Sequence, residues 1–228
     1  MNRLKILASL LPFVLLASCH QGSDTSPNNG GGSTVTWTIP SVGAEYVFQS
    51  TSPGLAKTVL DTAIIVTTGQ HLGGKTNVIT YEDHAGTIGT AFYNIEDNGD
   101  ISDGDAALGD TTFAWTTFPT ASHQPISDPV TDTTEGGTHI FRSNVRTYVG
   151  AETLTTLAGS FSTLHVRETS ISIVTGPDSL DCNASDTSIL DRCYAPTIGL
   201  YVKVTNSGTN DGVTSEPSEV DLIKYVPK

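Results

Sequence analysis

Apolar and polar positions alternate along most of the chain after residue 34, with the period of two that is typical of β-strands. No segment shows a clear helical period. The pattern predicts a mainly all-β protein with few or no helices, in which ten or more strands form a curved antiparallel sheet, a half-barrel or a sandwich. We expect strands within residues 35–39, 45–48, 58–68, 75–81, 88–95, 111–118, 138–149, 152–157, 161–174, 198–205 and 220–226.

Turns and loops follow from the residues between these stretches. Asn98-Gly99 separates Phe92–Ile95 from Ile101 and predicts a hairpin with a type I′ turn, since both residues tolerate positive φ. Residues 119–137 are rich in Pro, Asp and Thr and predict a long polar loop. Residues 177–192 predict a second loop-like excursion.

The first 34 residues have a different character. Arg3 and Lys5 precede an apolar run over residues 6–17, which is too short for a membrane span of about 20 residues and suits a secretory signal. Leu16-Ala17-Ser18-Cys19 closely resembles the lipobox of bacterial lipoproteins. The resemblance implies that Cys19 receives a diacylglycerol and that the chain is cut before it. An ordinary cleaved signal with a chance cysteine is the alternative.

Three segments follow from this interpretation. Residues 1–18 are the lipoprotein signal peptide, residues 19–34 are the lipidated cysteine and a flexible tether of Gly, Ser, Asn, Asp and Pro, and residues 35–228 are a single β-rich domain. The expected location is the bacterial cell envelope, with the lipid inserted in a membrane. His20, rather than Asp, follows Cys19 and favours the outer membrane.

The charge balance narrows the choice of partners. The full chain has 11 basic and 24 acidic residues, and cleavage before Cys19 would remove Arg3 and Lys5, which leaves a net charge of −15. Such a surface repels nucleic acid, so we expect no nucleic-acid partner.

Two cysteines remain once Cys19 carries a lipid. Cys182 and Cys193 lie in loop-like sequence, and in an oxidising envelope they predict a disulfide. A two-cysteine metal site is the alternative, but no CxxC motif or nearby histidine supports it.

The most acidic stretch, residues 96–105, offers oxygen ligands for Ca²⁺. The weak candidates are Asp97, Asp100, Asp103 and Asp105. Counted from Glu96, the sixth position is Ile101 instead of Gly and the twelfth is Ala107 instead of Glu, so a solvated hairpin with acidic flanks explains the stretch better. We therefore expect no metal and no cofactor.

Catalytic motifs are missing from the sequence. The six histidines show no metal-ligand spacing, and no HExxH, GxSxG or phosphate-binding glycine loop occurs. Asp83-His84 and Asp132 with His139 are weak hints of a Ser-His-Asp site. Trp37, Trp115 and Tyr81 are expected in the core rather than on a sugar-binding surface. We assign no catalytic residue.

The last eighty residues resemble a group of uncharacterised envelope lipoproteins. The similar segments are Glu152 to Phe161 running into Leu164-His165-Val166, Tyr194 to Val202, and Glu219 to Leu222, with Thr197 in place of the usual Gly. The sheets of these proteins are similar to the curved sheet of periplasmic lipoprotein carriers. The resemblance implies a fold and transfers no active site.

Three functional hypotheses remain. The first is a membrane-anchored, non-enzymatic binding or scaffold module whose partner is an apolar small molecule or an envelope protein. The second is an envelope hydrolase with a site assembled from scattered His, Asp and Ser. The third is a structural or adhesive module stiffened by calcium.

Overall fold

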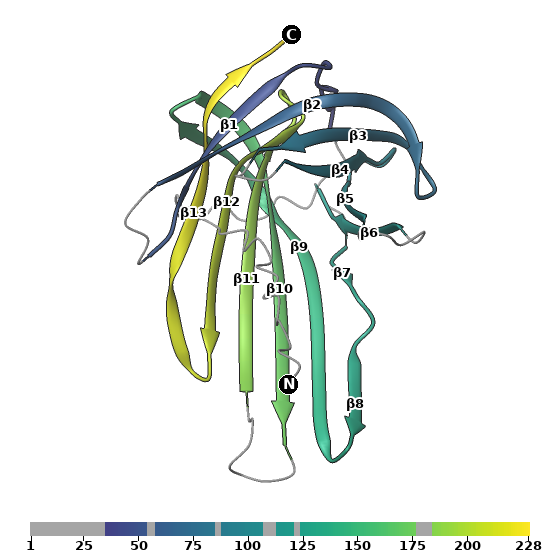
Figure 1. Cartoon of the computed structure of the whole chain (residues 1–228), viewed down its shortest axis with the longest axis vertical. Coiled ribbons are helices and arrows are strands. Elements are labelled where there is room, and N and C mark those ends of the chain that lie inside the picture. Colours follow the sequence, from purple (N-terminus) through teal and green to yellow (C-terminus); the bar gives the residue numbers. More distant parts are fainter. Residues whose placement is uncertain (1–34, 54–57, 85–87, 107–112, 121–123, 177–183) are drawn as a thin grey trace, which may run out of the picture.

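A computed structural model describes residues 35–53, 58–84, 88–106, 113–120, 124–176 and 184–228, and it shows one antiparallel sheet of 13 strands (Figure 1). Within these ranges there is no helix, and so none that is long and apolar enough to cross a membrane. The all-β prediction is confirmed. The strands are β1 (Glu45–Thr51), β2 (Val59–Leu72), β3 (Lys75–Asp83), β4 (Gly89–Ile95), β5 (Ile101–Ala106), β6 (Phe113–Phe118), β7 (Ile126–Ser127), β8 (Thr131–Glu135), β9 (Thr138–Thr156), β10 (Gly159–Thr175), β11 (Ala184–Ala195), β12 (Leu200–Asn210) and β13 (Val213–Val226).

Two meanders meet in the middle of the sheet. The strand order is β6-β5-β4-β3-β2-β1-β13-β12-β11-β10-β9-β7, and β8 also pairs with β9. The first and last strands, β1 and β13, therefore lie side by side, with Gln49 opposite Asp221. The sheet curls until Asp103 of β5 reaches Arg192 of β11 in an ion pair, which makes it a nearly closed barrel.

The barrel interior is filled by side chains from alternate strand positions. The largest of those that are fully buried include Tyr46, Phe48, Ile65, Ile79 and Leu222. Burial of each such side chain stabilises the fold by roughly 1.5–3 kcal/mol. Aromatic rings pack together here, with centroids of Phe48 and Tyr201 5.0 Å apart. The Tyr46 hydroxyl, which could not be buried without a partner, donates to the Ile198 carbonyl at 2.6 Å.

Strands β9 to β13 continue below the barrel as a projecting sheet, which we call the extension (Figure 1). β9 has 19 residues and β10 has 17. At roughly 3.3 Å per residue these strands are about 55–65 Å long, more than the barrel itself requires. Most of the side chains on the extension are half-buried or exposed.

Three local predictions were wrong. Residues 35–39 are not a strand: Thr38 donates to the Pro196 carbonyl and the Trp37 indole to the Gly99 carbonyl, so this segment crosses the end of the barrel. Residues 119–137 are not only a loop, because they contain β7 and β8. Much of the expected excursion at residues 177–192 is β11.

The hairpin at Asn98-Gly99 is present, with a different turn. Glu96 N–H donates to the Asp100 carbonyl and Gly99 N–H to the Glu96 carbonyl, both at 2.8 Å. Among these residues only Gly99 has a positive φ, of 91°. This is a type I turn followed by a glycine in the left-handed region, rather than a type I′ turn.

Candidate functional site: a polar trough below the barrel

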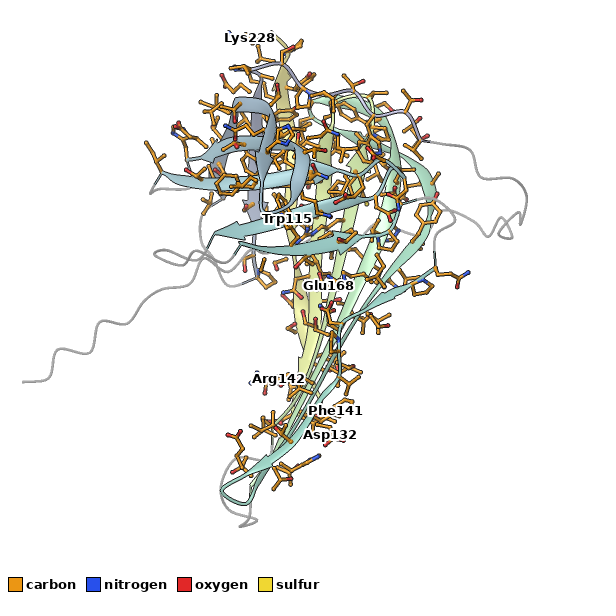
Figure 2. All side chains as sticks on the ribbon, turned by 90° about the vertical axis from the view of Figure 1, so that its right-hand side faces the viewer. Trp115, Asp132, Phe141, Arg142, Glu168 and Lys228 are labelled. Carbon is orange, nitrogen blue, oxygen red and sulfur yellow. The ribbon has the colours of Figure 1, made fainter. Side chains whose placement is uncertain are left out.

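A pocket of about 330 Å³ lies on the extension, where the inner face of the barrel continues downward. We call it the trough. Its lining residues are Asp128, Pro129, Arg142, Ser143, Asn144, Ser170, Ile171, Ser172, Asp186 and Ser188. Figure 2 shows Arg142 on this extension and Glu168 nearer the barrel.

Strand register arranges the trough floor in two rows. Arg142 of β9, Ser172 of β10 and Asp186 of β11 are direct cross-strand neighbours and form the lower row. Asn144, Ser170 and Ser188 form the next row towards the barrel. Directly opposed residues in an antiparallel sheet share one face, so these six side chains project on the same side.

The upper row is held in place by hydrogen bonds. The Asn144 amide donates to Asp128 Oδ2 at 3.1 Å and to Glu168 Oε1 at 2.6 Å. The Ser170 hydroxyl donates to Asn144 Oδ1 at 3.3 Å. Ser188 donates in turn to Asn206 Oδ1 at 3.0 Å. This row is therefore ordered before any ligand arrives.

The lower row keeps unused hydrogen-bonding capacity. Asp186 Oδ1 has no hydrogen-bond partner among the described residues. The exposed Arg142 guanidinium likewise makes no ion pair or hydrogen bond with any residue in the described ranges. A carboxylate and a guanidinium therefore lie on either side of Ser172. The guanidinium is exposed, whereas Asp186 Oδ1 is covered by neighbouring atoms.

Charged and aromatic side chains lie beside Asp128 of the trough lining, which pairs with Arg146. The ring of Phe118 lies between two arginines, with the guanidinium carbon of Arg192 4.2 Å and that of Arg146 5.9 Å from its centroid. Arg146 pairs with Asp128, and Arg192 pairs with Asp103. Burial alone would lower the pKa of Arg192, but its neighbours Tyr194 and Asp103 hold that pKa above its usual value.

The predicted lipidation site, Cys19, lies outside the described residues, and so does Cys182. Cys193 is fully buried on β11, with its Sγ 3.6 Å from Glu152 Oε1.

The Cys182–Cys193 disulfide stays a prediction, because Cys182 lies outside the described residues. Strand β11 is paired without interruption from Ala184 to Cys193, nine residues that span about 30 Å.

The acidic stretch does not bring its candidates together. Asp97 is exposed, whereas Asp100 is buried and accepts from the Thr120 backbone N–H at 2.8 Å. Asp103 pairs with Arg192 across the barrel, and the side chain of Asp105 lies outside the described part. Nowhere in the described residues do three His, Cys, Asp or Glu side chains form a metal-binding group.

Histidines meet carboxylates in three places among the described residues. Half-buried His84, next to Asp83 in the sequence, lies 3.4 Å from Glu82. Exposed His139 lies 2.8 Å from Asp132, as the sequence hinted. Buried His165 lies 2.7 Å from Asp191, with its other ring nitrogen 3.6 Å from Glu152.

Within the described residues no serine is hydrogen-bonded to His84, His139 or His165, so none of them forms a Ser-His-Asp arrangement. Carboxylates face both nitrogens of His165, which leaves neither free to take a proton from a serine. Arg167 also donates two bonds to Asp191, at 2.7 and 3.0 Å. Burial would raise the pKa of Asp191, but the bonds from His165 and Arg167 hold it below its usual value. The cluster is a buried ion-pair network outside the trough.

Of the three aromatic residues expected in the core, two are found there. Trp37 and Tyr81 pack against the core as predicted. Trp115 instead donates from its indole to the Gly73 carbonyl at 2.9 Å, away from the main core.

Sequence reasoning missed the trough. The sequence does hold a signal, which is a change from apolar to polar residues along one face of the strands. Val166, nearer the barrel, is apolar and buried, whereas positions farther along the same face are polar: Ser170, Ser172, Asp186 and Ser188. Which residues share that face becomes visible only when the register is known.

No family model and no curated protein matches the chain. Solved structures do match. A crystal structure of a candidate lipoprotein from Parabacteroides distasonis has a TM-score of 0.52 at 14% identity, over 84% of this chain and 99% of that one. A candidate exported protein with a YmcC-like fold from Bacteroides fragilis has a TM-score of 0.44 at 15% identity, over 84% and 99%. At such identity the first likeness shows the fold, an all-β architecture shared with a protein described as a lipoprotein.

Proposed function

We propose that this protein is a lipid-anchored lipoprotein of the bacterial envelope, held in the outer membrane through Cys19, and that its β-rich domain is a non-enzymatic binding module. The lipobox sequence and the fold shared with a candidate lipoprotein support the anchor. The trough supports the binding role.

The observation that carries this proposal is the unused capacity of Arg142 and Asp186 in a pocket whose upper row is already ordered. Carboxylate oxygens that are buried without a donor are uncommon in folded proteins, and among the described residues Asp61 Oδ1 on β2 is another. The filled barrel interior favours a polar ligand in the trough over an apolar ligand inside the barrel.

The test is native mass spectrometry of the full protein, purified from its membrane in mild detergent. We expect a bound small molecule that is lost in Ser172→Trp, because the indole fills the trough floor. Thr187→Trp is the matched control, since Thr187 lies on the opposite face of β11. The mass of the chain itself should equal that of residues 19–228 plus the acyl groups on Cys19.

Two results would contradict the proposal. A ligand that Ser172→Trp retains does not bind in the trough. A chain mass without acyl groups, or a start other than Cys19, would refute the anchor.

A further inference from the structure

We infer that the ligand of the trough is a neutral oligosaccharide, bound through its hydroxyl groups. This inference rests on the proposed binding function and names its ligand class. It follows from the side-chain groups on the trough floor and from the lack of backbone groups free to bind a ligand there.

The floor offers side chains and no backbone groups. β10 pairs with β9 on one side and with β11 on the other along the whole trough, so the backbone N–H and C=O groups of its floor are used in the sheet. A peptide that binds by adding a strand needs a free edge, and the centre of this floor has none. A ligand there must be recognised by hydroxyl, amide, carboxylate and guanidinium groups.

These groups require both donors and acceptors from one ligand. Asp186 only accepts hydrogen bonds, Arg142 only donates, and the hydroxyls of Ser170 and Ser172 do both. Arg142 and Asp186 are anchored on strands two apart, so their Cα atoms are about 9–10 Å from one another. A ligand that reaches both is larger than one small ion or one amino acid. Repeated hydroxyl groups on an extended molecule meet all of these requirements at once.

Charge favours a neutral ligand over an acidic one. The chain carries a net charge of −13, and Asp128, Glu168 and Asp186 lie in or beside the trough. Arg146 is already paired with Asp128, which leaves Arg142 as the cation in the lining that lacks a partner among the described residues. Pro129 supplies apolar atoms against which a sugar ring can pack.

The experiment is a binding screen with the full lipidated protein in detergent. The probes are neutral hexasaccharides (maltohexaose, cellohexaose, mannohexaose and N-acetylated chitohexaose), hexagalacturonate as the acidic comparison, and hexaalanine as the peptide. We expect at least one neutral glycan to bind, and Arg142→Gln and Asp186→Ala each to weaken it about tenfold, because each removes a hydrogen bond to a charged group. Ser172→Trp should abolish binding.

Two control variants accompany these changes. Lys224→Gln removes one positive charge at an exposed site on β13, and Thr187→Trp adds an indole on the outer face of β11. Both should bind the glycan like the unmodified protein.

The other outcomes overturn the inference. Preference for hexagalacturonate or hexaalanine, glycan binding that survives Ser172→Trp, or binding of no probe would each do so. If native mass spectrometry still finds a small molecule that Ser172→Trp displaces, the binding function stands and only the ligand class is wrong. If it finds none, both fail.

Discussion

Ionisable side chains on this protein are used in two ways. His165, Asp191 and Arg167 satisfy one another in a buried network on the sheet. Arg142 and Asp186 do not pair with each other. Asp186 lies on β11, as Asp191 does, and Arg142 lies on β9, next to the β10 strand of His165 and Arg167. The trough therefore contains charged groups that lack partners among the described residues. We take such groups as the indicators of function.

Asp61 on β2 gives a prediction at the residue scale. Burial, together with the neighbouring carboxyl of Asp83, raises the pKa of Asp61 to about 6. The folded protein therefore holds a proton that the unfolded chain releases near its ordinary pKa of 3.8. This contribution to stability is complete below about pH 4 and is lost as the pH rises through about 6.

Asp61→Asn removes the titrating group. We expect the variant to gain about 1 kcal/mol relative to the unmodified protein at pH 7, after allowance for solvent screening of a half-exposed site, and little at pH 4. Urea unfolding at both pH values measures the difference. An equal gain at both would contradict the assignment.

At the scale of elements, the turn between β11 and β12 fixes the segment that crosses the barrel end. Gly199 has φ of 72°, and a Cβ there would lie 2.3 Å from the Thr38 carbonyl oxygen and 2.8 Å from Pro40. Trp37 is placed by the same crossing, because Thr38 donates to Pro196 at the turn. The glycine is therefore required both by the backbone conformation and by the close approach of residues 38–40.

Gly199→Ala tests this close approach. We expect a loss of about 3 kcal/mol in the free energy of unfolding, because the clash with backbone adds to the cost of positive φ. Gly74→Ala is the control: its φ is 80°, but nothing lies within 4 Å of the added Cβ, so only about 1 kcal/mol should be lost. Chemical denaturation measures both. Equal losses would show that backbone conformation alone accounts for the effect.

At the scale of the whole molecule, the barrel is nearly closed by side chains where strand pairing ends. β6 is one end of the strand order, and its Phe118 lies against Arg192 and Arg146 from the other half of the sheet. The ion pair of Arg192 with Asp103 joins residues 89 positions apart in the chain.

Arg192→Met removes this closure while it keeps the length of the side chain. We expect hydrogen exchange to become faster in β5 and β6, because those strands retain only the pairing through β4, and the unfolding free energy to fall by about 3 kcal/mol as Asp103 loses its buried partner. Lys203→Met is the control, since Lys203 pairs with Glu219 and Asp221 instead. Uniformly faster exchange over all strands would contradict a local closure.

The sequence by itself determined the fold class and the position of most strands. Alternation is a local property, and it placed β1 to β4 to within a few residues because one face of each is buried. It missed β8, whose residues are all exposed, because a strand with two exposed faces has no alternation to detect. It also assigned a strand to residues 35–39. These residues alternate in polarity, but they cross the end of the barrel without pairing as a strand.

Only the tertiary structure decided the pairings that matter for function. The neighbours β1 and β13, the ion pair of Arg192 with Asp103, and the row of Arg142, Ser172 and Asp186 join residues that are distant in the chain. A shift of one residue in register would turn each of these side chains to the opposite face of the sheet. Register depends on the packing of the whole barrel, so the trough exists only once the sheet is assembled.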